Sequence, residues 1–318
     1  MVERAEPVRF PGSNDVELDG RLERPAGPVR TYALFAHCFT CSKDLFAARR
    51  IAAGLAGRGI ATLRFDFAGL GRSGGDFADT TFSANVDDLV AAADRLRSTY
   101  GAPAVLVGHS LGGAAVLAAA ERIPEARAIA TVGAPADVGH VRHLITSAED
   151  ELRASGEAVV LIGGGRFRLK RGFLDDLDGH RLAERIAHLD RALLVLHAPR
   201  DEVVGIENAS AIFAAAKHPK SFVSLDDADH LLTRRADAEY VAHMIAAWAS
   251  RYLPEDEAIE LPAEGVVEVA ETGVGASARP CASAGTLCGR TSPPRSAATI
   301  PGPGRTICSW PRSAPARR

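Results

Sequence analysis

The most informative motif of this chain is Gly108-His-Ser-Leu-Gly112. A short apolar run at 104–107 precedes it, and an alanine-rich helical pattern at about 112–122 follows it. Small residues around Ser110 let strand and helix approach closely, and the sharp turn exposes the serine hydroxyl. The helix start behind Ser110 also presents free N–H groups and a partial positive charge. The stretch therefore predicts a nucleophilic serine at a strand-to-helix turn.

Apolar strand patterns and helical patterns alternate on both sides of this turn. Continuous apolar runs typical of buried strands occur at 32–36, 60–65, 104–107, 128–132, 192–196 and 221–225. Helical spacing occurs at about 44–57, 82–98, 112–122, 205–217 and 237–252. Residues 16–23 alternate apolar and polar side chains, which indicates an antiparallel strand. The sequence therefore predicts the α/β class, with a mostly parallel sheet flanked by helices.

One long insertion interrupts the alternation between the strands at 128 and 192. It contains a helix-like part at 138–155 and a hairpin-like part at 159–169 that turns at 163–165. An insertion of this length in a compact domain is often functional. We expect residues of about 136–190 to form a lid, with Phe167, Phe173 and Leu174 as candidate pocket residues.

A base and an acid for Ser110 follow later in the chain. A serine hydroxyl needs a base to take its proton, and the expected order along the chain is Ser, acid, His. His230 follows the strand at 221–225, and Asp201 follows the strand at 192–196, so both reach the sheet edge where Ser110 lies. We expect His230 as the base and Asp201 as its orienting acid. Four other carboxylates are close enough in sequence to be considered, namely Glu202, Asp226, Asp227 and Asp229.

An oxyanion in acyl transfer needs backbone donors. The N–H of Leu111, directly after the serine, is the first expected donor. The loop after the strand at 32–36 is expected to supply the second. We assign this role to Phe39, with Cys38 and Thr40 as alternatives.

Together these segments resemble the α/β-hydrolase superfamily. The motifs that carry the resemblance are His37-Cys38-Phe39, Asp66-Phe-Ala-Gly-Leu-Gly-Arg-Ser-Gly74, Gly108-His-Ser-Leu-Gly112, and the surroundings of Asp201 and His230. It covers about residues 16–252 and implies the α/β-hydrolase fold. The run Ala36-His-Cys-Phe-Thr-Cys-Ser-Lys-Asp44 resembles a narrower group, the hydrolases fused to an OsmC-type domain. Many relatives carry glycine where this chain has Cys38.

Two other motifs suggest different chemistry. Cys38-x-x-Cys41 could be a redox or metal pair, but no second Cys/His pair lies at zinc spacing, and two small buried thiols are expected instead. Gly69-x-Gly71-x-x-Gly74 matches a dinucleotide fingerprint, which would indicate a nucleotide-dependent oxidoreductase. The residues after it continue a loop rather than open a helix. We therefore expect a turn before the helix at 82.

The end of the chain has a different composition. We place the hydrolase domain at 1–254, a linker and the start of an OsmC-like strand at 255–275, and a disordered tail at 276–318. The tail holds seven Arg and no Asp, Glu or Lys. Back-translation of 284–317 with GC-rich codons permits a shifted frame that resembles the stretch before the first reactive cysteine of OsmC-type peroxide reductases. We interpret the tail as a frameshift rather than as a nucleic-acid-binding arm, so Cys281, Cys288 and Cys308 would carry no chemistry.

Bulk composition narrows the partners and the location. Residues 1–275 hold 30 basic and 40 acidic side chains, a formal charge of −10, which gives no footprint for nucleic acid. No apolar run reaches the length of a membrane helix. The segment 1–10 has no apolar signal region. We expect a cytoplasmic protein with reduced cysteines and no membrane partner.

These observations lead to one expected function and two alternatives. The expected function is a serine hydrolase that transfers an acyl group from a small-molecule carboxylic ester to water, with no metal and no cofactor. A thioester or a peptide amide is the alternative substrate. A non-catalytic module that supports an OsmC-type partner domain is an alternative from a different class.

Overall fold

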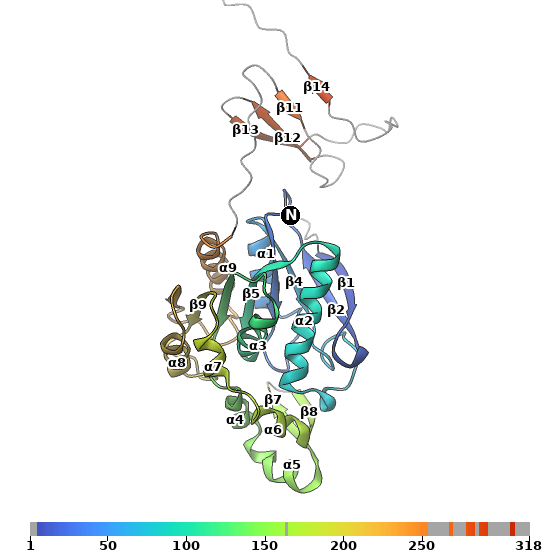
Figure 1. Cartoon of the computed structure of the whole chain (residues 1–318), viewed down its shortest axis with the longest axis vertical. Coiled ribbons are helices and arrows are strands. Elements are labelled where there is room, and N and C mark those ends of the chain that lie inside the picture. Colours follow the sequence, from blue (N-terminus) through green and yellow to red (C-terminus); the bar gives the residue numbers. More distant parts are fainter. Residues whose placement is uncertain are drawn as a thin grey trace, which may run out of the picture. The chain divides into compact units, whose positions relative to one another are not determined.

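The structure is a computed structural model that describes residues 5–162 and 165–253, together with the backbone of four short strands further along. The chain divides into two units, Met1–Pro25 with Val29–Pro254, and Ala26–Pro28 with Glu255–Arg318. Figure 1 shows the elements of both units. Among the described residues, no helix combines the length and the apolar character needed to cross a bilayer. A cytoplasmic location stays a prediction.

An eight-stranded sheet forms the centre of the first unit, in the order β1-β2-β4-β3-β5-β6-β9-β10. Its strands are β1 Ala5–Pro11, β2 Glu17–Glu23, β3 Thr31–Ala36, β4 Ile60–Phe65, β5 Pro103–His109, β6 Ala128–Val132, β9 Ala192–His197 and β10 Lys220–Ser224. The pairs β1–β2 and β2–β4 are antiparallel, and the other pairs are parallel. This is the α/β-hydrolase fold, and the predicted mostly parallel sheet is confirmed.

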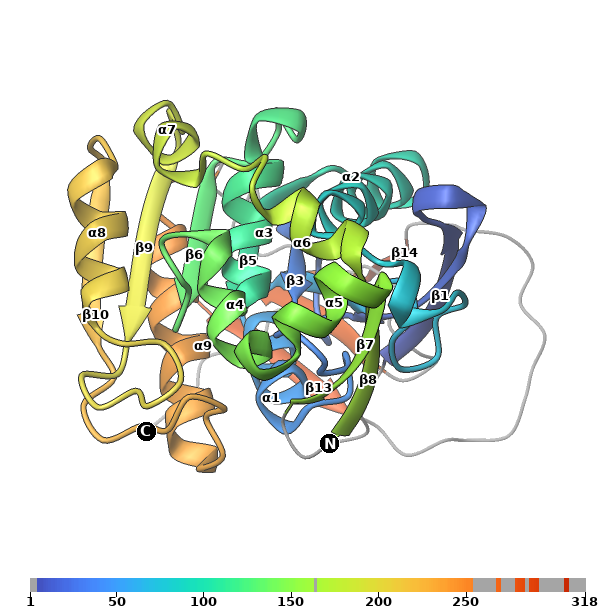
Figure 2. The same ribbon diagram turned by 90° about the horizontal axis from the view of Figure 1, so that it is seen from below.

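The central strands are apolar on both faces because helices cover both faces. Along β5, for example, Val105 and Val107 pack into one core and Leu106 packs into the other, as the two-residue period of a strand requires. Helices α1 Phe46–Ala56 and α9 Arg235–Ala249 contribute to the first core. Helices α2 Phe82–Thr99, α3 Leu111–Ala119 and α8 Glu207–Ala215 contribute to the second. Figure 2 shows the sheet between these two layers.

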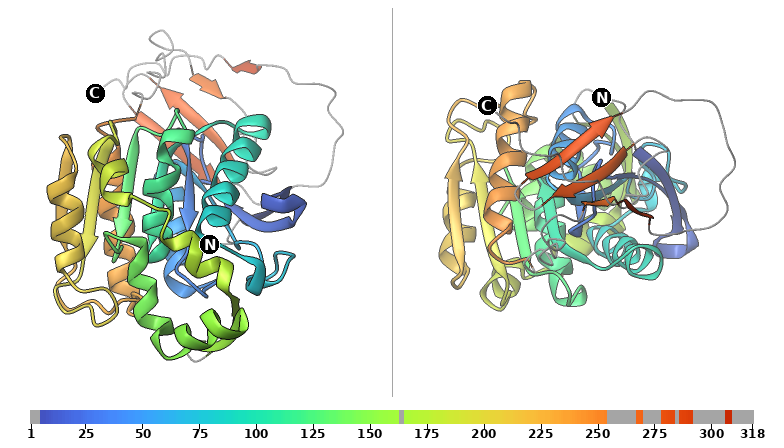
Figure 3. Two further views of the ribbon diagram at one scale, coloured as in Figure 1. Left: turned by 60° about the horizontal axis from the view of Figure 1, so that its bottom comes forward. Right: turned by 90° about the horizontal axis from the view of Figure 1, so that it is seen from above.

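The insertion between β6 and β9 is made of short elements. They are η4 Val138–Val141, α4 Arg142–Ile145, η5 Thr146–Ala148, α5 Glu149–Ser155, β7 Glu157–Ile162, β8 Gly165–Lys170, α6 Arg171–Leu177 and α7 Leu182–Ala187. The predicted hairpin is present as the antiparallel pair β7–β8. The helix-like part is broken into four pieces rather than one helix, and α6 and α7 were not predicted. The left view of Figure 3 shows α5 and α6 projecting from the sheet.

Two ion pairs and one aromatic contact hold the hairpin to a one-turn helix, η2 Phe77–Asp79. Arg168 pairs with Asp76 at 2.5 Å, and Lys170 pairs with Asp79. The rings of Phe77 and Phe167 lie 5.0 Å apart between their centroids. Exposed pairs of this kind are each worth only about 0–1 kcal/mol. The main attachment of the hairpin is therefore its buried apolar side chains, which belong to the same core as α2 and α3, namely Ala158, Val160, Ile162 and Leu169.

In the second unit the described strands form a four-stranded sheet, in the order β13-β12-β11-β14. They are β11 Val267–Val269, β12 Ala278–Ser283, β13 Thr286–Thr291 and β14 Thr306–Cys308. β11 falls where the sequence predicts a strand. The other three fall inside 276–318, where the sequence predicts disorder. The remaining residues of that segment lie outside the described residues, so disorder there stays a prediction, as does the OsmC-like character of 255–275.

Candidate active site

Ser110 occupies the turn between β5 and α3, as predicted. Its backbone has φ 55° and ψ −127°, a conformation that costs about 1–3 kcal/mol and persists only when the surroundings enforce it. Two contacts enforce it here. The N–H of Ser110 donates to the carbonyl of Val132 at 2.8 Å, and the Ser110 carbonyl accepts from the N–H of Gly113 at 2.8 Å.

Close packing explains the glycines around this turn. A Cβ at Gly108 would lie 2.3 Å from the carbonyl oxygen of Gly112. A Cβ at Gly112 would lie 2.4 Å from the carbonyl oxygens of both Ala36 and His37. No side chain fits at either distance, so only glycine allows α3 to approach β5 and the loop after β3 this closely.

His230 and Asp201 meet at the same edge of the sheet. The Nδ1–H of His230 donates to Oδ2 of Asp201 at 2.7 Å. The other oxygen, Oδ1, accepts from the N–H groups of Val203 and Val204, each at 2.9 Å. Both oxygens of the carboxylate are therefore occupied, and the hydrogen bond fixes the proton of His230 on Nδ1 and leaves Nε2 as the free acceptor.

Asp201 is held as a carboxylate. Burial alone would raise its pKa, but the hydrogen bonds from His230, Val204 and Val203 outweigh burial and lower the pKa below the ordinary value for Asp. Its side chain is 2% exposed. A buried negative charge beside the imidazole stabilises the imidazolium that forms when His230 takes a proton.

His109 ties the His230 loop to the serine turn. Its Nε2–H donates to the carbonyl of His230 at 2.7 Å, and the two rings lie 5.2 Å apart between centroids. His109 directly precedes Ser110, so this bond joins the backbone of the predicted base to the residue beside the predicted nucleophile. Burial and the nearby His230 lower the pKa of His109 to about 4, so the ring is neutral at physiological pH.

Other carboxylates near His230 have different roles. Asp229 accepts hydrogen bonds from the backbone of Leu231 and from Thr233, and Glu202 is exposed. Among the described residues, Asp201 is the carboxylate whose oxygen accepts from the ring of His230. The structure therefore favours Asp201 over the neighbours that the sequence also offers.

Phe39 and Leu111 line one small cavity beside the serine turn. The other lining residues are His37, Cys38, Phe67, Leu70, Asn85, Gly112 and Ala115. The N–H of Leu111 belongs to the first turn of α3, whose N–H groups have no carbonyl partner within the helix. The loop after β3 and the start of α3 therefore meet where two oxyanion donors are expected.

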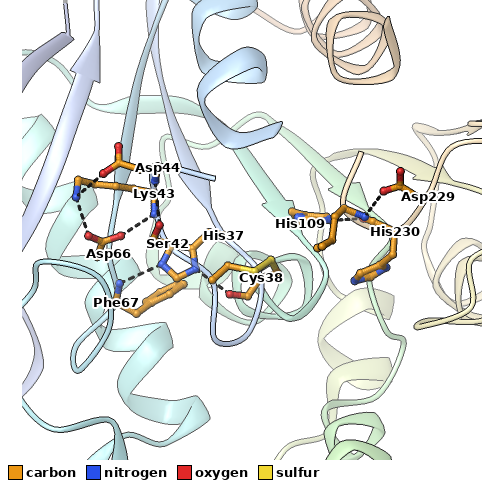
Figure 4. The surroundings of a disulfide bond; sticks show 12 residues. His37, Cys38, Ser42, Lys43, Asp44, Asp66, Phe67, His109, Asp229 and His230 are labelled. Carbon is orange, nitrogen blue, oxygen red and sulfur yellow. Dashed lines mark hydrogen bonds and ion pairs between the residues drawn. A yellow bond between two sulfur atoms is a disulfide. The ribbon is translucent and has the colours of Figure 1, made fainter. Parts of the chain in front are cut away.

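Cys38 and Cys41 are not free thiols, contrary to the prediction. They form a disulfide with their Cα atoms 5.3 Å apart (Figure 4). The expectation of reduced thiols rested on the expected cellular compartment. The turn from Cys38 to Cys41, closed by a bond from the Cys41 N–H to the Cys38 carbonyl at 3.2 Å, brings the two side chains into bonding range.

A buried ion cluster anchors the far end of this loop and was not predicted. The side chain of Lys43 is 1% exposed, and its Nζ lies 2.7 Å from both Asp19 and Asp66. Oδ1 of Asp66 also accepts from the backbone N–H of Lys43 at 2.6 Å. Beside this group, Arg64 pairs with Glu23 at 2.7 Å. The cluster joins β2, the end of β4 and the loop that carries Phe39.

An aromatic group connects the same loop to the insertion between β6 and β9. The ring of Phe39 stacks on Phe173 at 5.4 Å and 21°, and it also contacts Phe77 at 5.4 Å. Phe77 in turn contacts Phe167. Phe173 and Leu174 are each 1% exposed. Of the three candidate pocket residues, Phe173 is thus the one whose ring contacts Phe39.

The structure gives the glycine-rich motif a local role. Gly69 and Gly71 have positive φ values of 75° and 54°, and the next long helix begins only at Phe82. A Cβ at Gly71 would lie 2.1 Å from the Asp66 carboxylate. The segment is the predicted turn before α2. Within the part of the chain that the structure describes, no group of three or more His, Cys, Asp or Glu is arranged to hold a metal ion.

Comparison with known proteins agrees with this architecture. The chain belongs to the alpha/beta hydrolase family, whose family model matches residues 33–282. The esterase domain of a Rhodothermus marinus protein has 46% sequence identity and a TM-score of 0.66, over 79% of this chain and 100% of that one. Est1E from Butyrivibrio proteoclasticus with bound ferulic acid, at 19% identity and a TM-score of 0.63, covers 77% of this chain and 99% of its own, and shares the fold.

A curated relative adds a second activity to the comparison. The mitochondrial palmitoyl-protein thioesterase ABHD10 of Mus musculus is 28% identical over 187 residues, which are 56% of this chain. The matched part spans 62% of the length of that relative. The family therefore includes both esterase and thioesterase relatives of this chain.

Proposed function

We propose that this chain is a serine hydrolase that cleaves a carboxylic ester of a small molecule by acyl transfer to water. The observation that carries the proposal is the pairing of His230 with Asp201 at 2.7 Å beside the strained turn of Ser110. An ester is proposed first because the esterase domain from Rhodothermus marinus is 46% identical to this chain.

In the proposed mechanism Nε2 of His230 takes the proton of the Ser110 hydroxyl as the oxygen attacks the ester carbonyl. The N–H groups of Leu111 and Phe39 would hold the negative oxygen of the tetrahedral intermediate. The imidazolium returns its proton to the leaving alcohol, and an acyl enzyme forms. Water then attacks the acyl group with His230 again as the base, which releases the acid and restores Ser110.

Labelling with a fluorophosphonate probe tests the activated serine. Wild type is expected to label, and Ser110→Ala and His230→Ala are expected to lose labelling. Ser98→Ala, at an exposed position of α2, and His188→Ala, at the exposed residue that follows α7, are matched controls and should label as wild type does. A folded wild type that does not label, or a Ser110→Ala variant that does, would refute the proposal.

A thioester is the alternative substrate, supported by the thioesterase relative. A pair of substrates with the same acyl group, one an acylcholine and one an acylthiocholine, separates the two. A kcat/KM at least about tenfold higher for the thioester would reassign the substrate class. A panel of p-nitrophenyl esters of increasing chain length then measures the acyl size, and a peptide amide serves as the third substrate class.

A partnership with an OsmC-type domain is a separate proposal. It rests on the resemblance of residues 36–44 to fused hydrolases and on the shifted frame of 284–317. Resequencing the coding DNA tests it, because an intact frame with no trace of such a domain would remove its basis. A non-catalytic role in that partnership predicts no fluorophosphonate labelling at all.

A further inference from the structure

We propose that the Cys38–Cys41 disulfide is a redox-controlled positioning device for the oxyanion loop, so that reduction by a dithiol lowers kcat. The inference rests on the proposed function. The disulfide closes a ring of four residues, and Phe39, the proposed oxyanion donor, lies inside that ring. A change at the disulfide therefore acts directly on the backbone that would hold the oxyanion.

The backbone of Thr40 is strained, so the loop is expected to change conformation when a constraint is removed. Its φ is 60°, the left-handed region that a β-branched residue avoids. Such a conformation persists only when its surroundings enforce it. The disulfide and the hydrogen bond from the Cys41 N–H to the Cys38 carbonyl at 3.2 Å span this residue. Without the covalent bond, only the hydrogen bond between Cys41 and Cys38 still spans Thr40.

The residues on either side of the ring are fixed, which confines the change to the ring. His37 donates from Nδ1 to the Cys38 carbonyl at 2.8 Å and accepts from the N–H of Phe67 at 3.4 Å, and Figure 4 shows His37 and Phe67 beside the loop. On the other side, Lys43 is held by Asp66 through its backbone and its side chain. Release of the disulfide would therefore allow the backbone at Phe39 and Thr40 to move, while the loop ends stay in place and the Phe39 ring keeps its stack on Phe173.

The two cysteines of the disulfide differ in their exposure to solvent. Cys38 is 3% exposed and lines the small cavity with Leu111, whereas Cys41 is partly exposed. A thiolate of the dithiol would attack Sγ of Cys41 and form a mixed disulfide, and Cys38 would leave as a thiolate. The second thiol of the reductant then closes its own disulfide and releases Cys41. Two electrons and two protons pass to the protein, and the dithiol becomes a cyclic disulfide.

The expected kinetic signature is specific. A donor to the oxyanion acts only when the negative oxygen has formed, so its misplacement lowers kcat and leaves KM nearly unchanged. Complete loss of one such donor costs about 100- to 1,000-fold. Because Leu111 stays in place and Phe39 is displaced rather than removed, we expect kcat to fall about 10- to 100-fold on reduction.

The experiment compares oxidised and dithiol-reduced full-length chain on the ester panel. Cys281, Cys288 and Cys308 are replaced by Ser in every sample, so that the thiol count reports only Cys38 and Cys41. The expected result is a lower kcat with KM within about twofold, restored by reoxidation. Cys41→Ser is expected to show the reduced kcat and no response to dithiol. Thr40→Asn, which adopts positive φ more readily, is expected to narrow the ratio of oxidised to reduced kcat.

Each result has a clear meaning. An oxidised chain that neither labels with fluorophosphonate nor cleaves any ester overturns the proposed function and this inference together. An active oxidised chain whose kcat is unchanged after two thiols have appeared overturns this inference alone. Reduction that lowers only the melting temperature shows a purely structural disulfide and also overturns it. An unchanged kcat ratio in Thr40→Asn refutes the part played by Thr40.

Discussion

Replacement of Asp201 by Asn tests the geometry of the proposed site directly. The N–H groups of Val203 and Val204 both donate to the same oxygen of Asp201, Oδ1, each at 2.9 Å. In Asp201→Asn, only the amide oxygen can accept these two bonds, so the amide NH2 must face His230. A donor at that position requires Nδ1 of His230 to be the acceptor, which moves the ring proton to Nε2. His230 could then no longer take a proton from Ser110.

The loss expected from this reversal is large. In serine hydrolases of this geometry, the wrong tautomer lowers kcat by about 10⁴-fold, which corresponds to about 5 kcal/mol of transition-state stabilisation. The assay is steady-state hydrolysis of the best p-nitrophenyl ester at pH 7, with far-UV circular dichroism to confirm folding. KM should change little, because the tautomer affects proton transfer rather than binding.

Two neighbouring variants serve as controls for Asp201→Asn. Glu202→Gln changes the next carboxylate, which is exposed, and Asp229→Asn changes one that bonds Thr233 rather than the ring of His230. Each should keep kcat within about threefold of wild type. A loss below about tenfold in Asp201→Asn, or an equal loss in Glu202→Gln, would refute the assignment of the acid.

Three further predictions concern stability. Lys43→Met leaves the buried carboxylate of Asp66 without its cation and should lower the free energy of unfolding by about 3–5 kcal/mol in urea titrations; a loss under about 1 kcal/mol would contradict a structural role for the cluster. Gly112→Ala places a Cβ 2.4 Å from two carbonyl oxygens and should cost about 1–3 kcal/mol or prevent folding, and an unchanged melting temperature would disprove this close approach. The pKa of His109 is lowered to about 4 in the folded chain. Between pH 6.5 and 4, His109 therefore binds a proton in the unfolded chain but not in the folded chain. The free energy of unfolding should therefore fall as pH falls through that window, by about 3 kcal/mol from this residue. His109→Gln, which can still donate to the His230 carbonyl, should show a smaller fall, and an equal fall would contradict the prediction.

The sequence predicts the parallel part of the fold well because buried strands carry long apolar runs. β3, β4, β6 and β9 all lie where these runs occur. At the antiparallel edge, β2 lies where the alternation at 16–23 indicates a strand, but β1 was not predicted. In β1, only Val8 and Phe10 face the core, and the prolines and charged residues around them hide the two-residue alternation. The helices α6 and α7 have seven and six residues, which is too short for a helical period to be clear.

The site is predictable where one motif and the chain order determine it. Ser110 is marked by its turn, and Asp201 and His230 are marked by the strands they follow. Lys43 was missed because its partners come from distant segments, and only the fold brings Asp19 and Asp66 to it. The sequence did contain a signal for buried ion pairs here, because Arg64 lies within the buried strand at 60–65 and a buried arginine needs an acidic partner. The disulfide forms because the backbone turns between Cys38 and Cys41. The spacing of the two cysteines alone does not predict this turn.

The glycine contacts of the serine turn also limit how this protein can change. At Gly108 and Gly112 a Cβ would meet backbone atoms at 2.3–2.4 Å, and backbone cannot move aside as a flexible side chain can. We therefore expect every non-glycine residue at these two positions to lower stability or prevent folding, so randomising them would add mostly destabilised members to a directed-evolution library. Diversity is better introduced at Phe167, which is only partly buried. New substrate ranges would then arise in the insertion between β6 and β9, while the serine turn stays unchanged.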